Sequence, residues 1–304
     1  MQIAIMGAGA VGSYYGALLA RAGHAVTLIG RVAHVEAIQA SGLMLETVSG
    51  RETFNVTAST SVSALKDAEL VLFCVKSTDT ETAGATIAPV LSDAAVVLSL
   101  QNGVDNASRL ADVLGREVIP VVVYAAVAMA GPGHVRHHGR GELVLGASPM
   151  SASLAALLQE ADICTEVSGN VTGMLWAKLV INCAWNAVSA MTQQPYGALM
   201  AIEGVAALVT AVVAECQAVA QACAVMLPDD ITNSVLMIAE RMPGQRSSMA
   251  QDLARARPTE IEHLNGFIVR QGQAHGIDTP ANHTLLVLVR ALEQSRNTCD
   301  IPSG

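Results

Sequence analysis

The sequence predicts an α/β domain with a largely parallel sheet, followed by an all-α domain. Strands and helices alternate through the first half, and several of these strands are continuous apolar runs, as in parallel sheets covered on both faces. From about Gly173 onward the sequence is typical of helices only. Because 304 residues exceed the usual size of a single core, we expect two domains, residues 1–170 and 171–304.

The first element pair is "MQIAIMGAGAVGSYYGALLARAGHAVTLIGR", which predicts a strand to Met6, a helix to about Gly23 and a strand over 25–29. The glycines Gly7, Gly9 and Gly12 form a G-x-G-x-x-G turn between strand and helix. In a Rossmann-type fold these glycines allow the tight turn, the approach of a pyrophosphate and the packing of helix on strand. The phosphates then bind at the helix N-terminus, so this unit predicts a dinucleotide site.

The end of the second strand indicates which dinucleotide binds. NAD enzymes place an acidic residue about 20 residues after the glycines, where it binds the ribose 2′-hydroxyl. Here Gly30 and Arg31 stand in that region, and an arginine can bind a 2′-phosphate. The sequence therefore favours NADP, with an exposed loop arginine as the alternative.

Further strands are predicted over 69–77, 94–103 and 116–124. Lys76 and Asn102 lie at the ends of two of them, where open α/β sheets bind ligands, although strand ends also become polar for structural reasons. The stretch "HVRHHGRGELVLGA" predicts two short strands joined by a Gly-rich turn.

In the second half we expect helices over 174–190, 198–226, 230–241, 259–275 and 282–294. In "WAKLVINCAWN" the residues Lys178, Asn182 and Asn186 are four apart, so each advances by only ~40° on a helix and all three share one face. An ammonium beside a carbonyl can polarise it and donate a proton as an alkoxide develops. Lys178 is therefore a candidate general acid, against the alternative of a surface lysine.

Composition and charge disfavour several classes of binding partner. A net charge of -9 disfavours nucleic acid and anionic lipid. The apolar runs are too short or too interrupted to span a membrane, and no signal peptide precedes the first strand, so we expect a cytoplasmic protein. The six cysteines form no CxxC or Cys/His cluster, so we expect no metal site and no disulfide framework, with most thiols buried.

Four stretches together resemble the ketopantoate reductases (2-dehydropantoate 2-reductases): the glycine-turn unit, the "QNG" at 101–103, "WAKLVINCAWN" and "SSMAQDLARARPTEIEHLNGFI" at 247–268. The resemblance implies a Rossmann NADPH domain and a helical domain like the C-terminal domain of 6-phosphogluconate dehydrogenase. It also implies NADPH-dependent reduction of 2-dehydropantoate to pantoate in pantothenate synthesis.

The resemblance implies a role for each matching residue. Lys178 matches the catalytic general acid, and Asn182, Asn186 and Ser248 match substrate-binding residues, with Asn102 also near the substrate. The matching cofactor contacts are Gly7, Ala8, Gly9, Ala10, Val11, Gly12, Arg31, Lys76, Asn102, Ala126 and Glu260.

One position departs from the family pattern. Ten residues after Asn186 the family often has another substrate asparagine, whereas this chain has Tyr196. A reductase of another branched or aromatic 2-oxo acid is therefore an alternative, and a non-catalytic NADP-sensing module is a third. A homodimer is common for related folds, but no residue pattern establishes one here.

Overall fold

The computed structural model describes residues 1–299, with side chains as far as residue 295. The chain divides into two compact units, Met1–Val171 and Thr172–Gly304. The first unit contains all the described strands, and the described part of the second contains only helices and short connections. The predicted fold class is confirmed.

The described strands of the first unit form one mixed sheet in the order β4-β3-β9-β8-β7-β6-β1-β2-β5, with β10 beside β9. The neighbours from β7 through β6, β1 and β2 to β5 are parallel, as the continuous apolar runs predict. The strand bounds are β1 Gln2–Met6, β2 Ala25–Ile29, β3 Leu43–Thr47, β4 Gly50–Phe54, β5 Thr57–Ser59, β6 Leu70–Phe73, β7 Val96–Ser99, β8 Ile119–Gly131, β9 His134–Gly146 and β10 Thr165–Ser168.

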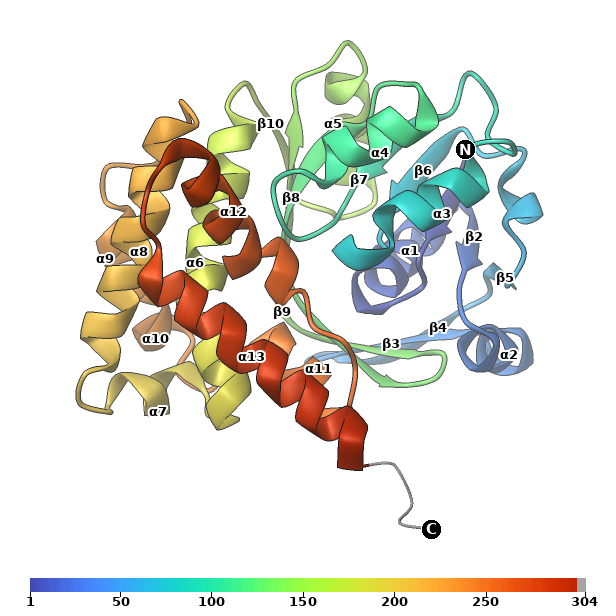
Figure 1. Ribbon diagram of the computed structural model, residues 1–304. Coiled ribbons are helices and arrows are strands. Elements are labelled where there is room, and N and C mark those ends of the chain that lie inside the picture. Colours follow the sequence, from blue (N-terminus) through green and yellow to red (C-terminus); the bar gives the residue numbers. More distant parts are fainter. Residues whose placement is uncertain (300–304) are drawn as a thin grey trace. The chain divides into compact units, whose positions relative to one another are not determined.

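Two hydrophobic clusters cover the two faces of the central strands. Alternate residues of β1 enter different clusters: Ile3 and Ile5 join α1, whereas Ala4 and Met6 join α3 and α4. Figure 1 shows α3 and α4 side by side. The helices of this unit are α1 Ala10–Arg21, α2 Val32–Ser41, α3 Thr80–Ile87, α4 Asn106–Leu114 and α5 Ser151–Glu160.

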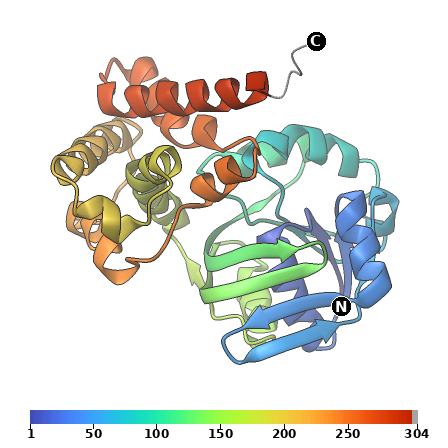
Figure 2. The same ribbon diagram turned by 90° about the horizontal axis from the view of Figure 1, so that it is seen from below.

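The prediction for "HVRHHGRGELVLGA" was wrong. These residues form a single strand, β9, which pairs antiparallel with β8, and β8 itself continues to Gly131. The glycines that suggested a turn form a bulge: Gly139 has φ 138°, Arg140 has φ 57°, and the register shifts beside them. The hairpin β3–β4 was not predicted, and its β3 strand pairs with β9 (Figure 2).

The second unit consists of helices α6 to α13 in chain order. Their bounds are α6 Val171–Thr192, α7 Tyr196–Met200, α8 Val205–Ala222, α9 Ile231–Leu236, α10 Ile238–Arg241, α11 Ser248–Ala254, α12 Asn265–His275 and α13 Pro280–Cys299. The helix predicted over 198–226 is interrupted because Gly204 adopts φ 87° before α8 begins. The helix predicted from residue 259 begins at Asn265, because the residues before it form the short turn Ile261–His263 instead. Helix α11 was not predicted.

By length and composition, α8 is the one helix among the described residues that could cross a membrane. Its 18-residue window has a mean hydropathy of 1.6, and 39% of that window is buried. A helix in the core of a helical bundle meets the same test, so this finding assigns no membrane to the chain.

Candidate functional site

In the glycine turn, close packing requires a glycine at two of the three positions but not at the third. A Cβ atom on Gly7 would lie 2.8 Å from the Cys74 carbonyl carbon, and one on Gly12 would lie 2.7 Å from Ile5 Cγ2 and overlap the Gly7 oxygen. A Cβ atom on Gly9 would meet nothing within 4 Å, and Gly9 is exposed. Packing explains Gly7 and Gly12, whereas the open space over Gly9 fits the approach of a ligand.

The N-terminus of α1 has the features of a phosphate site. Its N-cap is Gly9, no side chain caps the helix, and its first turn carries no acidic residue. The first-turn amides of Ala10, Val11 and Gly12 are the donors that such a helix end offers to an anion. The turn therefore fits a dinucleotide pyrophosphate.

The end of β2 is attached to this turn. The Ile29 oxygen accepts hydrogen bonds from Gly7 N at 3.1 Å and Ala8 N at 2.8 Å, so the residues that follow Ile29 begin beside the glycines. Arg31 is the exposed N-cap of α2, and it forms no ion pair with any of the residues that the structure describes. A guanidinium in this place fits a 2′-phosphate.

His34 is a residue of this region that the sequence analysis missed. Its Nδ1 accepts a hydrogen bond from Gly133 N at 2.8 Å, so Nε2 carries the proton and lies 3.2 Å from Ser13 Oγ. Burial lowers the pKa of His34, which keeps the ring neutral. His34 thus connects α2 to α1 and to the β8–β9 turn, and its spacing of three from Arg31 was the only signal.

Lys76 and Asn102 lie beyond the carboxyl ends of the parallel neighbours β6 and β7, at the sheet edge of the glycine turn. Both are partly buried. Ser77 Oγ donates to the Asn102 oxygen at 2.8 Å, which joins the two loops. The structure therefore brings the glycine turn, Arg31, Lys76 and Asn102 to one region of the first unit.

A buried polar network, also missed from the sequence, holds these two loops. Asn106 Nδ2 donates to the Asn102 oxygen at 2.5 Å and to Ser77 Oγ at 3.2 Å, and its Oδ1 accepts from Thr80 Oγ1 at 3.2 Å. Gln101 Nε2 donates to Thr80 Oγ1 at 2.8 Å. All these side chains except that of Asn102 are at least 95% buried. Buried polar groups are costly unless paired, so this network fixes the Asn102 main chain.

The strand predicted over 116–124 leaves Ala126 beyond its end, and the structure contradicts this placement. Ala126 is inside β8, opposite Gly139 and beside the bulge, because β8 continues past Tyr124. Its role as a cofactor contact remains a prediction.

In the second unit, the stripe of Lys178, Asn182 and Asn186 lies on the 22-residue helix α6. Lys178 and Asn182 are partly buried, and Asn186 is 5% exposed. Helix α6 is fixed from several sides, because Trp185 Nε1 donates to the Val235 oxygen at 2.9 Å and Asn265 Nδ2 to the Cys183 oxygen at 3.1 Å. The stripe therefore lies on a helix that is hydrogen-bonded to two neighbouring segments.

The residues around Asn186 come from three segments. Ser247 Oγ donates to the Asn186 oxygen at 3.1 Å and accepts from Ala250 N at 3.0 Å, so it joins α11 to α6. Tyr196 Oη donates to Asn186 Oδ1 at 3.4 Å. Ser248, the predicted substrate contact, is exposed at the first position of α11, directly after this anchor.

Glu260 is partly buried at the start of the turn Ile261–His263, which leads into α12. Helix α12 contacts α6 through Asn265 and through the Phe267 ring, which lies 5.5 Å from that of Trp176. Glu260 thus precedes a helix that packs on the stripe-bearing helix.

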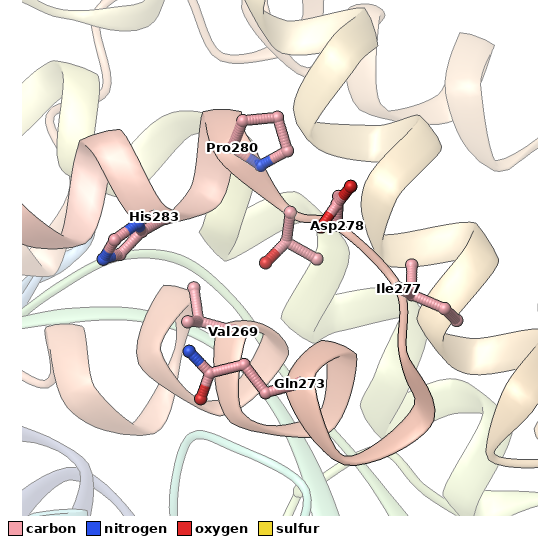
Figure 3. Close-up of a pocket in the computed structure, with 7 residues that line it drawn as sticks. Val269, Gln273, Ile277, Asp278, Pro280 and His283 are labelled. Atoms are coloured by element: carbon pink, nitrogen blue, oxygen red, sulfur yellow. The ribbon is translucent and has the colours of Figure 1, made fainter.

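A pocket of about 320 Å³ lies between the end of α12 and the start of α13. Figure 3 shows the residues that line it. Its lining residues are Val269, Gln273, Ile277, Asp278, Thr279, Pro280 and His283. None of the predicted site residues lines it.

Within the described residues, no group of three or more His, Cys, Asp or Glu side chains could hold a metal ion. The five cysteines whose side chains are described are free, and Cys299 lies outside the described side chains. Cys183 and Cys216 are buried, Cys74 and Cys223 are partly buried, and Cys164 is exposed, so the expectation of mostly buried thiols is met only in part.

Comparison with known proteins gives a consistent result. Residues 3–150 match the family model "Ketopantoate reductase PanE/ApbA", and residues 170–293 match that of its C-terminal part. The 2-dehydropantoate 2-reductase of Pyrococcus horikoshii is 34% identical over 304 residues, covering 96% of this chain and 98% of the relative.

Solved structures agree. A PanE/ApbA family ketopantoate reductase from Ralstonia eutropha JMP134 is 57% identical, with a TM-score of 0.96, over 98% of this chain and 100% of that one. A D-mandelate dehydrogenase in complex with NADH and anilino(oxo)acetate is 26% identical, with a TM-score of 0.92, over 98% of this chain and 100% of that one. With both family models matched over most of its length, the chain belongs to the ketopantoate reductase family.

Proposed function

We propose that this protein reduces 2-dehydropantoate to pantoate with NADPH, as a cytoplasmic enzyme of pantothenate synthesis. The observation that carries the proposal is the α6 stripe, in which Lys178, Asn182 and Asn186 share one face of the helix. Family membership supports the same reaction. A protein that only sensed NADP would have no need of this stripe.

The stripe suits a 2-oxo acid because it offers an ammonium and two amides. An ammonium can bind the 2-oxo oxygen, and amide groups can bind carboxylate or hydroxyl oxygens. The oxygens of the acid are suitable partners for the polar groups on this otherwise apolar helix. Ser248, beside the Ser247 anchor, adds a hydroxyl at the Asn186 end.

NADPH, when bound, supplies the hydride that adds to C2 of the acid. Lys178 polarises the carbonyl and donates its proton to the oxygen, so the carbonyl becomes a hydroxyl and the lysine regains a proton from water. The glycine turn and the α1 N-terminus would hold the pyrophosphate, and Arg31 would hold the 2′-phosphate. Lys76, Asn102 and Glu260 remain our predicted cofactor contacts.

The test is a steady-state panel of NADPH oxidation with 2-dehydropantoate, a branched aliphatic 2-oxo acid and benzoylformate. We expect 2-dehydropantoate to give the highest kcat/KM. A lower value than that of either competitor would contradict the proposed substrate. The same panel with NADH tests the cofactor, and equal kcat/KM with both cofactors would contradict the role of Arg31.

The second candidate is reduction of an aromatic or other branched 2-oxo acid by the same residues. Tyr196 favours it, because a buried aromatic ring lies beside Asn186 and packs 5.4 Å from Trp185. The likeness to a D-mandelate dehydrogenase supports it as well. In the panel this candidate predicts the highest kcat/KM for one of the competitors.

A further inference from the structure

Tyr196 is held in place from two sides. At the start of α7, Tyr196 N donates to the Gln245 oxygen at 3.0 Å, and Gly197 N donates to the Pro243 oxygen at 3.0 Å. The Tyr196 ring packs against Trp185, which is fully buried and itself fixed to Val235. The ring therefore has little freedom to leave its place beside Asn186.

The Tyr196 hydroxyl acts as a donor to the Asn186 side chain. It lies 3.4 Å from Asn186 Oδ1, and the tyrosine is 8% exposed. Burial raises the pKa of the Tyr196 phenol, so the hydroxyl keeps its proton at physiological pH. The hydrogen bond is long, so we expect it to orient the amide more than to stabilise the fold.

Asn186 is also fixed through its main chain by Ser247. The remaining freedom of the residue is rotation of its amide, which can present either its oxygen or its NH₂ group to a ligand. With Oδ1 turned to Tyr196, the NH₂ group has no protein acceptor among the described residues and is left for a ligand.

We propose that Tyr196 is a positioning residue that holds the Asn186 amide with its NH₂ group toward the bound acid. This inference rests on the proposed function, because it takes Asn186 as a substrate contact. The Asn186 amide then offers only its NH₂ donor to the acid. It selects an oxygen that can accept, in a carboxylate, carbonyl or hydroxyl group, and it rejects an ammonium group at that place.

The test is a double-mutant cycle of Tyr196→Phe and Asn186→Ala. Tyr196→Phe removes the donor and keeps the ring on Trp185. We expect it to raise the KM for 2-dehydropantoate about two- to tenfold, the usual range for one hydrogen bond, with the KM for NADPH unchanged. In the Asn186→Ala background the same change should have less than about a twofold effect, because Tyr196 acts through Asn186.

The matched control is Tyr15→Phe, which removes another buried hydroxyl, one that bonds the Gly141 oxygen at 3.3 Å in the first unit. We expect it to leave the KM for the acid unchanged. Urea unfolding of every variant separates loss of stability from loss of binding. An unchanged KM in Tyr196→Phe, or an equal effect with and without Asn186, would overturn the inference.

A second readout is independent of turnover. Asn186→Ala identifies the side-chain amide ¹⁵N signal of Asn186, and we expect Tyr196→Phe to shift that signal. If the wild-type protein fails to reduce 2-dehydropantoate, the proposed function fails, and the cycle is run with the best acid of the panel. An unshifted signal overturns the role of Tyr196 whatever the substrate.

Discussion

Substitution of single glycines by alanine separates the fold from cofactor binding. In Gly12→Ala the new methyl group would overlap the Gly7 oxygen and lie 2.7 Å from Ile5 Cγ2. Overpacking of this kind costs about 1–3 kcal/mol, and backbone atoms give way less easily than side chains. In Gly9→Ala the methyl group meets nothing within 4 Å. The fold should then lose at most about 1 kcal/mol, because alanine is a poorer N-cap than glycine.

The effects on NADPH binding should differ from the effects on stability. The Gly9→Ala methyl group occupies the space that we assign to the pyrophosphate, where one charged hydrogen bond contributes about 1.5–3 kcal/mol. The Kd for NADPH should rise about 10- to 100-fold, since about 1.4 kcal/mol corresponds to tenfold. Fluorescence titration gives the Kd, and urea unfolding gives the free energy of unfolding.

Gly169→Ala is the matched control, because a Cβ atom there also meets nothing within 4 Å. It should change neither the Kd for NADPH nor the free energy of unfolding by a measurable amount. Wild-type NADPH affinity in Gly9→Ala would refute the pyrophosphate site. A loss of stability in Gly9→Ala as large as in Gly12→Ala would show that packing, not a ligand, requires the glycine.

Three further predictions concern the first unit. Arg31→Ala should raise the Kd for NADPH at least about tenfold and leave the Kd for NADH within about twofold, because only NADPH has the 2′-phosphate. Titration with both cofactors measures the two Kd values. An equal loss of affinity for both would contradict the role of Arg31. Asn106→Ala should lower the free energy of unfolding in urea by about 1–3 kcal/mol, because Thr80 and the Asn102 oxygen lose a buried partner. It should also weaken NADPH binding. An unchanged free energy of unfolding and an unchanged Kd would show that the network does not hold the loops. Burial lowers the pKa of His34 in the folded state below its ordinary value of about 6.5. As the pH falls through about 6.5, the unfolded chain therefore takes up a proton on His34 before the folded chain does. The free energy of unfolding falls accordingly. His34→Gln should flatten this part of the curve of unfolding free energy against pH, and an unaltered slope would contradict the assignment.

Local sequence patterns were enough to predict much of the fold. The strand predicted over 25–29 coincides with β2, because a short apolar run between Gly23 and Gly30 has clear ends. The spacing of Lys178, Asn182 and Asn186 was enough to place them on one helix face, since helical periodicity is local.

Features that depend on distant contacts were missed. Gly139 signalled a turn, but pairing with β8 makes it part of a bulge. Ser247 contacts Asn186 across 61 residues of sequence, and Asn106 contacts Ser77 across 29. In the sequence these residues look like ordinary polar loop residues, because only the fold shows which polar groups are buried.

The central claim is that Lys178 donates the proton in the reduction of a 2-oxo acid. The most direct measurement is kcat/KM for 2-dehydropantoate in Lys178→Ala and Lys178→Arg, with the Kd for NADPH measured on the same preparations. Lys66→Ala, which removes an exposed lysine of the first unit, is the control. We expect both Lys178 variants to lose about 10²- to 10⁴-fold in kcat/KM with NADPH binding retained, because arginine keeps the charge but does not release its proton. Wild-type turnover in Lys178→Ala would contradict the account.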